Sequence, residues 1–237
     1  MNTQQYIDLI SNITANRGMS IVGGILTTIF LFSLTLVLGT LLGIRLFMWR
    51  YNGNRIVVRI LTVLEQYMLY IPKSTFLIFV FHIFFGSNLK FNMLAAIVAL
   101  TIIFAFSVYW SIDLAMEGVD KGEIEAAYSM GYNKKTVLTR IIIPSTMPIF
   151  LYRYRENVIT HVQNTAIVEI ISVMDIQMVA DIIATEVSVP IVPILITTVV
   201  YLCIGLGASK LIDNLSEKLK HERTAEEQKE RFLKGKF

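Results

Sequence analysis

Five long apolar runs alternate with polar segments along the chain, and each is about as long as a membrane-spanning helix. The runs cover residues 21–42, 60–85, 93–112, 149–174 and 189–208. A helix of about 20 predominantly apolar residues crosses the hydrocarbon core of a bilayer. The pattern therefore predicts an all-α membrane protein with five transmembrane helices. The fourth run is more polar than the others, so hydropathy supports it least.

The segments outside these runs divide the chain into three parts. Residues 20–212 are predicted to form the transmembrane domain, and residues 213–237 form a charged tail that is either a solvated helix or disordered. Residues 1–19 are polar and carry apolar side chains at helical spacing. This first segment is therefore either an amphipathic helix on the membrane surface or a frayed tail.

The composition agrees with a membrane protein. Hydrophobic residues make up 54% of the chain and charged residues 16%, whereas an ordinary soluble domain is about 25% charged. Cys203 is the only cysteine, which excludes an intramolecular disulfide. Because the first segment is polar and the first apolar run is long, we expect a retained helix and not a cleaved signal peptide.

Lysine and arginine are unevenly distributed over the polar segments. Three segments carry four, four and eight of them: 45–59, 113–147 and 209–237. The alternate segments carry two in total: 1–19, 86–92 and 176–190. Cytoplasmic loops carry the excess of basic residues in membrane proteins. The N-terminus is therefore predicted outside and the C-terminus in the cytoplasm, as an odd number of crossings requires.

Several kinds of chemistry have no motif in this sequence. It contains no GxxxxGK[ST] phosphate loop, no HExxH or CxxC metal motif and no Ser/His/Asp pattern. We therefore expect no catalytic residue, no metal site and no cofactor bound by this chain, and no nucleic acid as a partner. If the chain drives transport with ATP, a partner subunit must hydrolyse it.

The loop 113–147 is predicted to form two short helices on the cytoplasmic side. Residues 123–130 make the first, with acidic side chains in its first turn, where the helix dipole favours them. Gly131 follows it and allows a left-handed turn. Residues 134–142 make the second helix, which should end before Pro144, since proline disfavours helical geometry at Ile143.

The spacing within this loop carries a family resemblance. The spaced residues are Glu125, Ala126, Ala127, Gly131, Ile141, Ile143 and Pro144. The pattern resembles the signature loop of the permease subunits of ABC importers, with isoleucine at position 143 in place of the usual leucine. In that family the loop inserts into a groove of the ATP-binding subunit, and closure of the ATPases moves the membrane helices.

The resemblance covers about residues 20–215 and points to the polar amino acid branch of that family. Further matching residues are Gly24, Thr27, Thr28, Phe84, Phe85, Gly86, Lys121, Gly122, Asn164 and Thr165. It implies a permease in the cell membrane that pairs with itself or a sister permease. It also implies two ATPase subunits that bind ATP and Mg, an external solute-binding protein, and import of an amino acid or similar small polar solute by alternating access.

The resemblance also implies which residues contact the ATPase. They are Glu123, Glu125, Ala126, Ala127, Met130 and Gly131.

The fourth apolar run contains an unusual number of polar side chains. Charged groups at the centre of a bilayer cost about 2.5–3.5 kcal/mol each on insertion scales, so they should face a cavity or pair with one another. The candidate residues of a substrate path are Arg153, Glu156, Asn157, His161, Gln163 and Asn164. Lys73 joins them because Pro72 frees a backbone carbonyl that needs a partner. A purely structural pairing, such as Arg153 with Glu156, is the alternative.

Two stretches depart from the family pattern and leave the cargo open. Residues 72–75 read Pro-Lys-Ser-Thr where the branch has an Arg-Gly-Thr-Pro-like segment, and residues 163–166 lack the usual charges. These departures keep open a regulatory or transport-deficient subunit built on the permease fold. Two further alternatives are an ion-coupled transporter or channel, which would leave the acidic loop unexplained, and a membrane-embedded enzyme, which would need a catalytic cluster.

Overall fold

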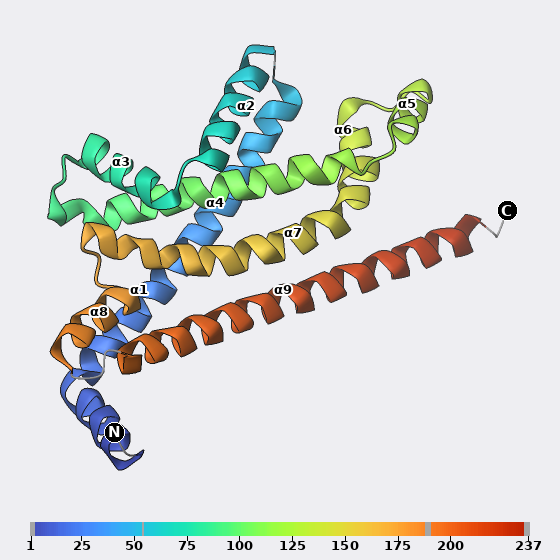
Figure 1. Ribbon diagram of the computed structural model, residues 1–237. Helices are drawn as coiled ribbons and strands as arrows, with labels where there is room; N and C mark the ends of the chain where they lie inside the picture. The colour runs from blue at the N-terminus through green and yellow to red at the C-terminus, as the bar shows by residue number, and fades with distance from the viewer. Residues whose placement is uncertain (1–2, 54, 188–190, 235–237) are drawn as a thin grey trace.

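The computed structural model describes residues 3–53, 55–187 and 191–234, and these residues are helical apart from short connections (Figure 1). The elements in chain order are α1 (Thr3–Asn52), α2 (Arg55–Tyr70), α3 (Lys73–Phe85), η1 (Leu89–Phe91), α4 (Asn92–Glu117), α5 (Lys121–Ser129), α6 (Lys134–Val137), η2 (Leu138–Ile142), α7 (Ile143–Asn164), η3 (Thr165–Ile171), α8 (Ile176–Glu186) and α9 (Ile191–Lys234). The predicted all-helical class is confirmed for the described residues.

Three helical stretches of the described residues are long and apolar enough to cross a membrane: Ala15–Asn52, Leu89–Glu117 and Ile191–Lys218. The bent pair α2–α3 makes a fourth if it counts as one span. The run 149–174 is not among them, because α7 carries Arg153, Arg155 and Glu156 within one membrane length. The structure therefore supports three or four apolar spans, fewer than the five predicted.

Helix α1 is continuous from Thr3 to Asn52, so no break separates the predicted N-terminal segment from the first span. Ile13 is buried in a cluster with Val179, Ile183 and Val192 of α8 and α9. Arg17 forms an ion pair with Glu186 at the end of α8. At Ile13 and Arg17, α1 is thus packed onto α8 and α9 and is not frayed.

The second predicted span is broken into two helices. Helices α2 and α3 meet at 114°, and the break falls at Pro72. Proline has no N–H to donate to the carbonyl four residues earlier, and its ring clashes with that carbonyl. The apolar run predicted as one membrane helix over residues 60–85 is therefore two helices with a sharp bend at the proline.

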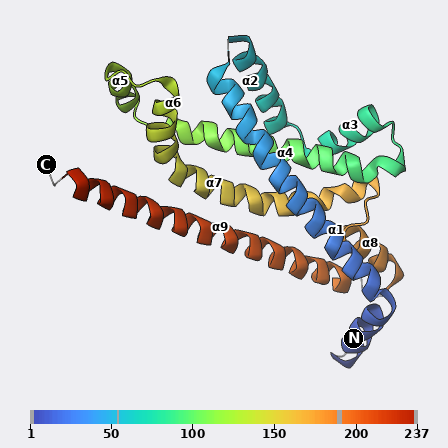
Figure 2. The ribbon, with the colours of Figure 1, turned by 180° about the vertical axis from the view of Figure 1, so that it is seen from behind.

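Helix α4 lies at the centre of the fold, crossed by α1 and flanked by α3 and α7 (Figures 1 and 2). Its buried face is rich in alanine, with Ala95, Ala96, Ala99 and Ala105 fully buried. Small side chains let membrane helices approach closely, so that dispersion contacts hold them together. Gly43 of α1 contributes to the same close approach, because a Cβ atom there would lie 2.6 Å from the Ala105 carbonyl oxygen.

This close contact gives a stability prediction. Gly43→Ala should lower the free energy of unfolding by about 1–3 kcal/mol, the usual cost of forcing extra atoms into a packed interface. Gly23→Ala is the matched control in the same helix, since nothing lies within 4 Å of a Cβ atom there. Thermal unfolding of the detergent-solubilised protein measures both. Equal midpoints for the two variants would contradict the packing argument.

Helix α9 runs beside α7 and continues to Lys234 without a break at the predicted boundary near residue 212. Its C-terminal end extends toward the side of the molecule that carries α5 and α6 (Figure 1). Of the two alternatives for the charged tail, the structure shows a helix as far as residue 234. The first two residues of the predicted fifth span lie outside the described residues.

Candidate functional site

The loop between α4 and α7 forms a small helical knob at one end of the molecule (Figure 2). Asp120 precedes α5, and its carboxylate accepts a hydrogen bond from the Gly122 amide at 2.8 Å. Asn133 caps α6 in the same way, through the Thr136 amide. Gly131, between the two helices, has φ +83°, the left-handed geometry predicted for it. The sequence therefore fixes the start of both helices and the turn that joins them.

The six predicted docking residues are divided between the surface of the knob and its core. Glu123, Glu125, Ala126, Met130 and Gly131 are exposed. Ala127 is fully buried, in a cluster with Val137, Leu138 and Ile142. Met48 and Tyr51 of α1 and Met116 of α4 pack against this cluster. Ala127 therefore anchors the knob to the ends of α1 and α4, while the acidic face of α5 points away from the fold.

The predicted end of the second short helix is wrong. Chain geometry stays helical through Ile143, which has φ −56° and ψ −50°. Residues Leu138–Ile142 form a π-helical turn, and the Ile143 amide donates to the Leu138 carbonyl. This wider turn leads directly into α7, where Pro144 occupies the first turn and needs no amide donor. The knob is thus joined to α7 by continuous helix and not by an extended hinge.

A polar cavity of about 560 Å³ lies between α4 and α7. Arg153, Glu156, Asn157 and Thr160 of α7 line it. Arg153 and Glu156 are both exposed, and their nearest atoms are 3.5 Å apart. Cavities that bind small molecules typically have volumes of about 300–1,000 Å³. Arg155 also lines the cavity, which therefore offers two cations and one anion, with Arg153 and Glu156 side by side, in a space of suitable size.

Two predicted path residues of α7, Asn157 and His161, make contacts inside the fold. Asn157 donates hydrogen bonds to the Ser107 carbonyl and to the Ser111 hydroxyl, so its amide also ties α7 to α4. His161 is fully buried, with Nε2 2.8 Å from the Thr35 hydroxyl and its ring centroid 4.3 Å from that of Phe104. It packs among α1, α4 and α7 and does not line the polar cavity.

The remaining predicted path residues lie elsewhere. Gln163 lines a second cavity of about 520 Å³ between α7 and α9. Asn164 is half-buried at the end of α7. Arg155, which lines both cavities, pairs with Asp213 of α9 at 2.8 Å. The surroundings of α7 are therefore divided into a polar side facing α4 and a more apolar side facing α9.

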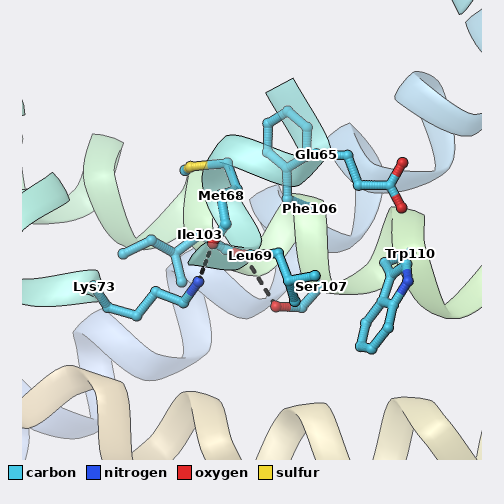
Figure 3. Close-up of a pocket in the computed structure, with 8 residues that line it drawn as sticks. All are labelled: Glu65, Met68, Leu69, Lys73, Ile103, Phe106, Ser107 and Trp110. Carbon is cyan, nitrogen blue, oxygen red and sulfur yellow. Dashed lines mark hydrogen bonds between the residues drawn. The ribbon is translucent and has the colours of Figure 1, made fainter. Parts of the chain in front are cut away.

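Lys73 meets the carbonyl that Pro72 leaves without a donor. Its Nζ donates to the Met68 carbonyl oxygen, and Figure 3 shows the side chain reaching across the break between α2 and α3. Glu65 lines the same small pocket, whose volume of about 50 Å³ would hold one or two water molecules. The pocket is too small for an amino acid, so the position of Lys73 is explained by the bent span.

Lys73→Met should therefore destabilise the protein by about 1–3 kcal/mol, the usual cost of leaving a buried polar group unsatisfied. Methionine keeps the length and the apolar stem of the side chain but cannot donate a hydrogen bond. Lys90→Met, at an exposed position in η1, is the control. If chemical denaturation gives the same midpoint for both variants, the Met68 carbonyl finds another donor and the argument fails.

Sequence reasoning did not anticipate the α4 side of the polar cavity. Trp110, Ser111 and Leu114 line it. The sequence pattern that could have indicated this side of the cavity is the pair Ser107 and Ser111, which lie four residues apart and so share one face of α4. This polar pair, in the apolar part of α4 over residues 102–112, marks the face that meets α7.

Comparison with known proteins adds a decisive observation. Residues 35–221 match the family described as binding-protein-dependent transport system inner membrane component. The chain belongs to this family. The match begins within α1, includes the whole knob and ends in α9, so the membrane helices and the knob described above are parts of one transport permease fold.

Individual relatives support the same family. The chain is 24% identical over 157 residues to the probable glutamine ABC transporter permease protein GlnM of Bacillus subtilis, covering 65% of this chain and 73% of that protein. It is 38% identical over 56 residues to the methionine import system permease protein MetP of the same organism, covering 24% of this chain and 25% of MetP.

Two solved structures share the fold. An amino acid ABC transporter crystallised with histidines superimposes with a TM-score of 0.76 and 23% sequence identity, over 86% of this chain and 96% of that one. The inward-facing MetNI methionine ABC transporter superimposes with a TM-score of 0.62 and 18% identity, over 82% and 95%. These likenesses confirm the predicted fold family.

Proposed function

We propose that this chain is a permease subunit that imports an amino acid or a similar small polar solute, driven by two ATPase subunits that dock on the α5–α6 knob. The exposed acidic face of α5, on a knob anchored by the buried Ala127, is the observation that carries the proposal. ATP and Mg would bind to the ATPases. A second permease subunit and an external solute-binding protein would complete the transporter.

The arrangement of the helices supports the proposed orientation in the cell membrane. The basic segments 45–59 and 113–147 and the C-terminal end of α9 lie toward one side of the molecule (Figure 1). The N-terminal part of α1 and helix α8 lie toward the other side. With α7 counted as a span despite its charges, this gives five crossings, the N-terminus outside and the C-terminus in the cytoplasm.

The polar cavity between α4 and α7 is the proposed substrate path. Arg153 can pair with a carboxylate and Glu156 with an ammonium group, and a free amino acid carries both. Charged groups of α7 would then face an aqueous path and not lipid, which removes most of their insertion cost. The relatives named for glutamine and methionine support amino acids as the cargo class.

Affinity purification of the full-length chain from its native membrane tests this proposal. We expect an ATPase and an external solute-binding protein to co-purify or to restore function when added. Uptake into proteoliposomes should then be measured with radiolabelled L-glutamine, L-methionine and L-histidine. If none of the three amino acids is taken up in the presence of the ATPase and the binding protein, the proposed cargo class is wrong.

A further inference from the structure

The end of α1 carries an arginine that holds two other helices. Arg50 Nη1 donates to the Tyr109 hydroxyl at 2.6 Å and to Glu65 Oε2 at 3.3 Å, and Nη2 lies 3.2 Å from Asp113 Oδ2. Glu65 belongs to α2, while Tyr109 and Asp113 belong to α4. Since guanidinium presents its donors in a rigid planar fork, one side chain fixes three partners at once.

These partners are shielded from water. Tyr109 is fully buried, and the side chains of Glu65 and Asp113 are 16% and 26% exposed. The Arg50 guanidinium also lies 5.8 Å from the centroid of the Tyr109 ring. Charged pairs that are partly shielded from solvent are less screened by salt and hold their geometry better than exposed ones. The network of Arg50, Glu65, Tyr109 and Asp113, called the joint below, is therefore expected to hold α1, α2 and α4 in a fixed arrangement, unlike an exposed ion pair.

The next residue connects this joint to the knob. The Tyr51 carbonyl accepts a hydrogen bond from Lys134 Nζ of α6 at 2.6 Å, and the same ammonium group lies 4.4 Å from the centroid of the Tyr51 ring. The Tyr51 side chain also packs against the knob core around Ala127. Two consecutive residues at the end of α1 thus contact the knob on one side and α2 and α4 on the other.

Helix α2 depends on this joint for its position. Of its sixteen residues, Leu61 and Met68 are buried, and Leu61 packs in a cluster with Leu46 and Phe47 of α1. Most of the remaining apolar side chains of α2 face outward. Besides these packing contacts, the bond from Arg50 to Glu65 ties α2 to the end of α1.

We propose that Arg50 is a positioning residue for energy coupling: it locks α2, and through it the bent second span, to the ATPase-docking knob so that they move as one body. The proposal rests on the proposed function, because it assigns the knob to ATPase docking. Without Arg50, movement of the knob would reach α4 and α7 but would no longer be transmitted in full to α2 and α3.

Distances between spin labels in the complete complex test this proposal. In a Cys203→Ser background, labels at Ile60→Cys on α2 and Lys135→Cys on α6 report how rigidly α2 follows the knob, and both positions are exposed. We expect a narrow distance distribution in the otherwise unchanged complex, with and without ATP and vanadate. Arg50→Gln should at least double the width of the distribution, and Arg50→Lys should give an intermediate width.

Two controls separate coupling from a general loss of structure. Arg45→Gln removes an exposed arginine of the same helix, which stacks over Trp49, and should leave the width unchanged. A second label pair, at Val22 and Asp181, reports on the contact between α1 and α8 at the far end and should stay narrow in Arg50→Gln. Broadening of both pairs, or an unchanged width at the first pair, would overturn the proposal.

The proposed function and this inference fail in different ways. If ATPase subunits do not co-purify with the unchanged chain, the docking assignment is wrong. If they co-purify equally with the unchanged chain and with Arg50→Gln while the width at the first pair stays the same, docking stands and the role of Arg50 is wrong.

Discussion

Replacing Glu125 by lysine is expected to abolish stable association with the ATPase. The side chain is exposed on α5, and the buried Ala127 core fixes the helix beneath it, so the variant should change the charge of the docking face without unfolding the knob. Reversing a charge that meets an opposite charge in an interface costs about 2–5 kcal/mol. Binding should therefore weaken roughly 30-fold or more, measured as ATPase retained on the immobilised permease.

Glu217→Lys is the matched control for this variant. Glu217 is also exposed and lies on α9, on the side of the molecule that we propose to be cytoplasmic, but outside the knob. The same change in net charge should leave ATPase retention at the level of the unchanged chain. Retention by Glu125→Lys at that level would show that α5 does not contribute the docking contact, and equal loss in both variants would point to a non-specific effect of net charge.

Replacing Glu156 by glutamine should reduce uptake by about 10-fold or more while ATPase retention stays unchanged. Glutamine keeps the size of the side chain but cannot pair with the ammonium group of an amino acid. A hydrogen bond to a charged group contributes about 1.5–3 kcal/mol. Its loss should raise the substrate concentration needed for half-maximal uptake by roughly 10-fold or more. The measurement is the substrate dependence of uptake into proteoliposomes.

Glu186→Gln is the matched control, because Glu186 also forms an exposed ion pair, with Arg17, but at the contact of α1 with α8 and outside the polar cavity. Its uptake should equal that of the unchanged chain. If Glu156→Gln also transports normally, the charges of α7 serve only to pair with each other, and the cavity between α4 and α7 is not the path.

The knob could be predicted almost completely from the sequence. Its two helices and its left-handed glycine depend on local rules that involve neighbouring residues only. The capping residues Asp120 and Asn133, which the prediction did not name, follow rules of the same kind. The exception is Ile143, where we expected an extended break and the chain remains helical. A π-helical turn just before Pro144 lets the chain continue as a helix into α7. Such a turn is not determined by local propensity alone.

The placement of the candidate path residues could be predicted only in part. Helical periodicity places Arg153, Asn157 and His161 on one face of a regular helix. It does not show how closely the neighbouring helices approach that face at each level. At Phe104 and Thr35 the neighbours close over His161. At Ser111 and Trp110 they leave the space that forms the polar cavity. Which polar residue is buried and which faces water is decided by these tertiary contacts.

The bend in the second span was also outside the reach of the pattern. Pro72 predicts a disturbed helix, but the angle of 114° depends on how α3 packs in the core and on the donor that Lys73 supplies. Proline kinks in membrane helices range from slight bends to full breaks, depending on what satisfies the freed backbone groups.

The central claim is that docked ATPases drive import through this chain, and ATP-dependent uptake by the purified complex tests it most directly. Proteoliposomes should contain the permease, its co-purified ATPase and the external solute-binding protein, with radiolabelled L-glutamine, L-methionine and L-histidine offered separately. We predict uptake of at least one of them that requires ATP on the knob side and is lost with Glu125→Lys. Uptake that proceeds equally without ATP, or that is unaffected by Glu125→Lys, would contradict the account.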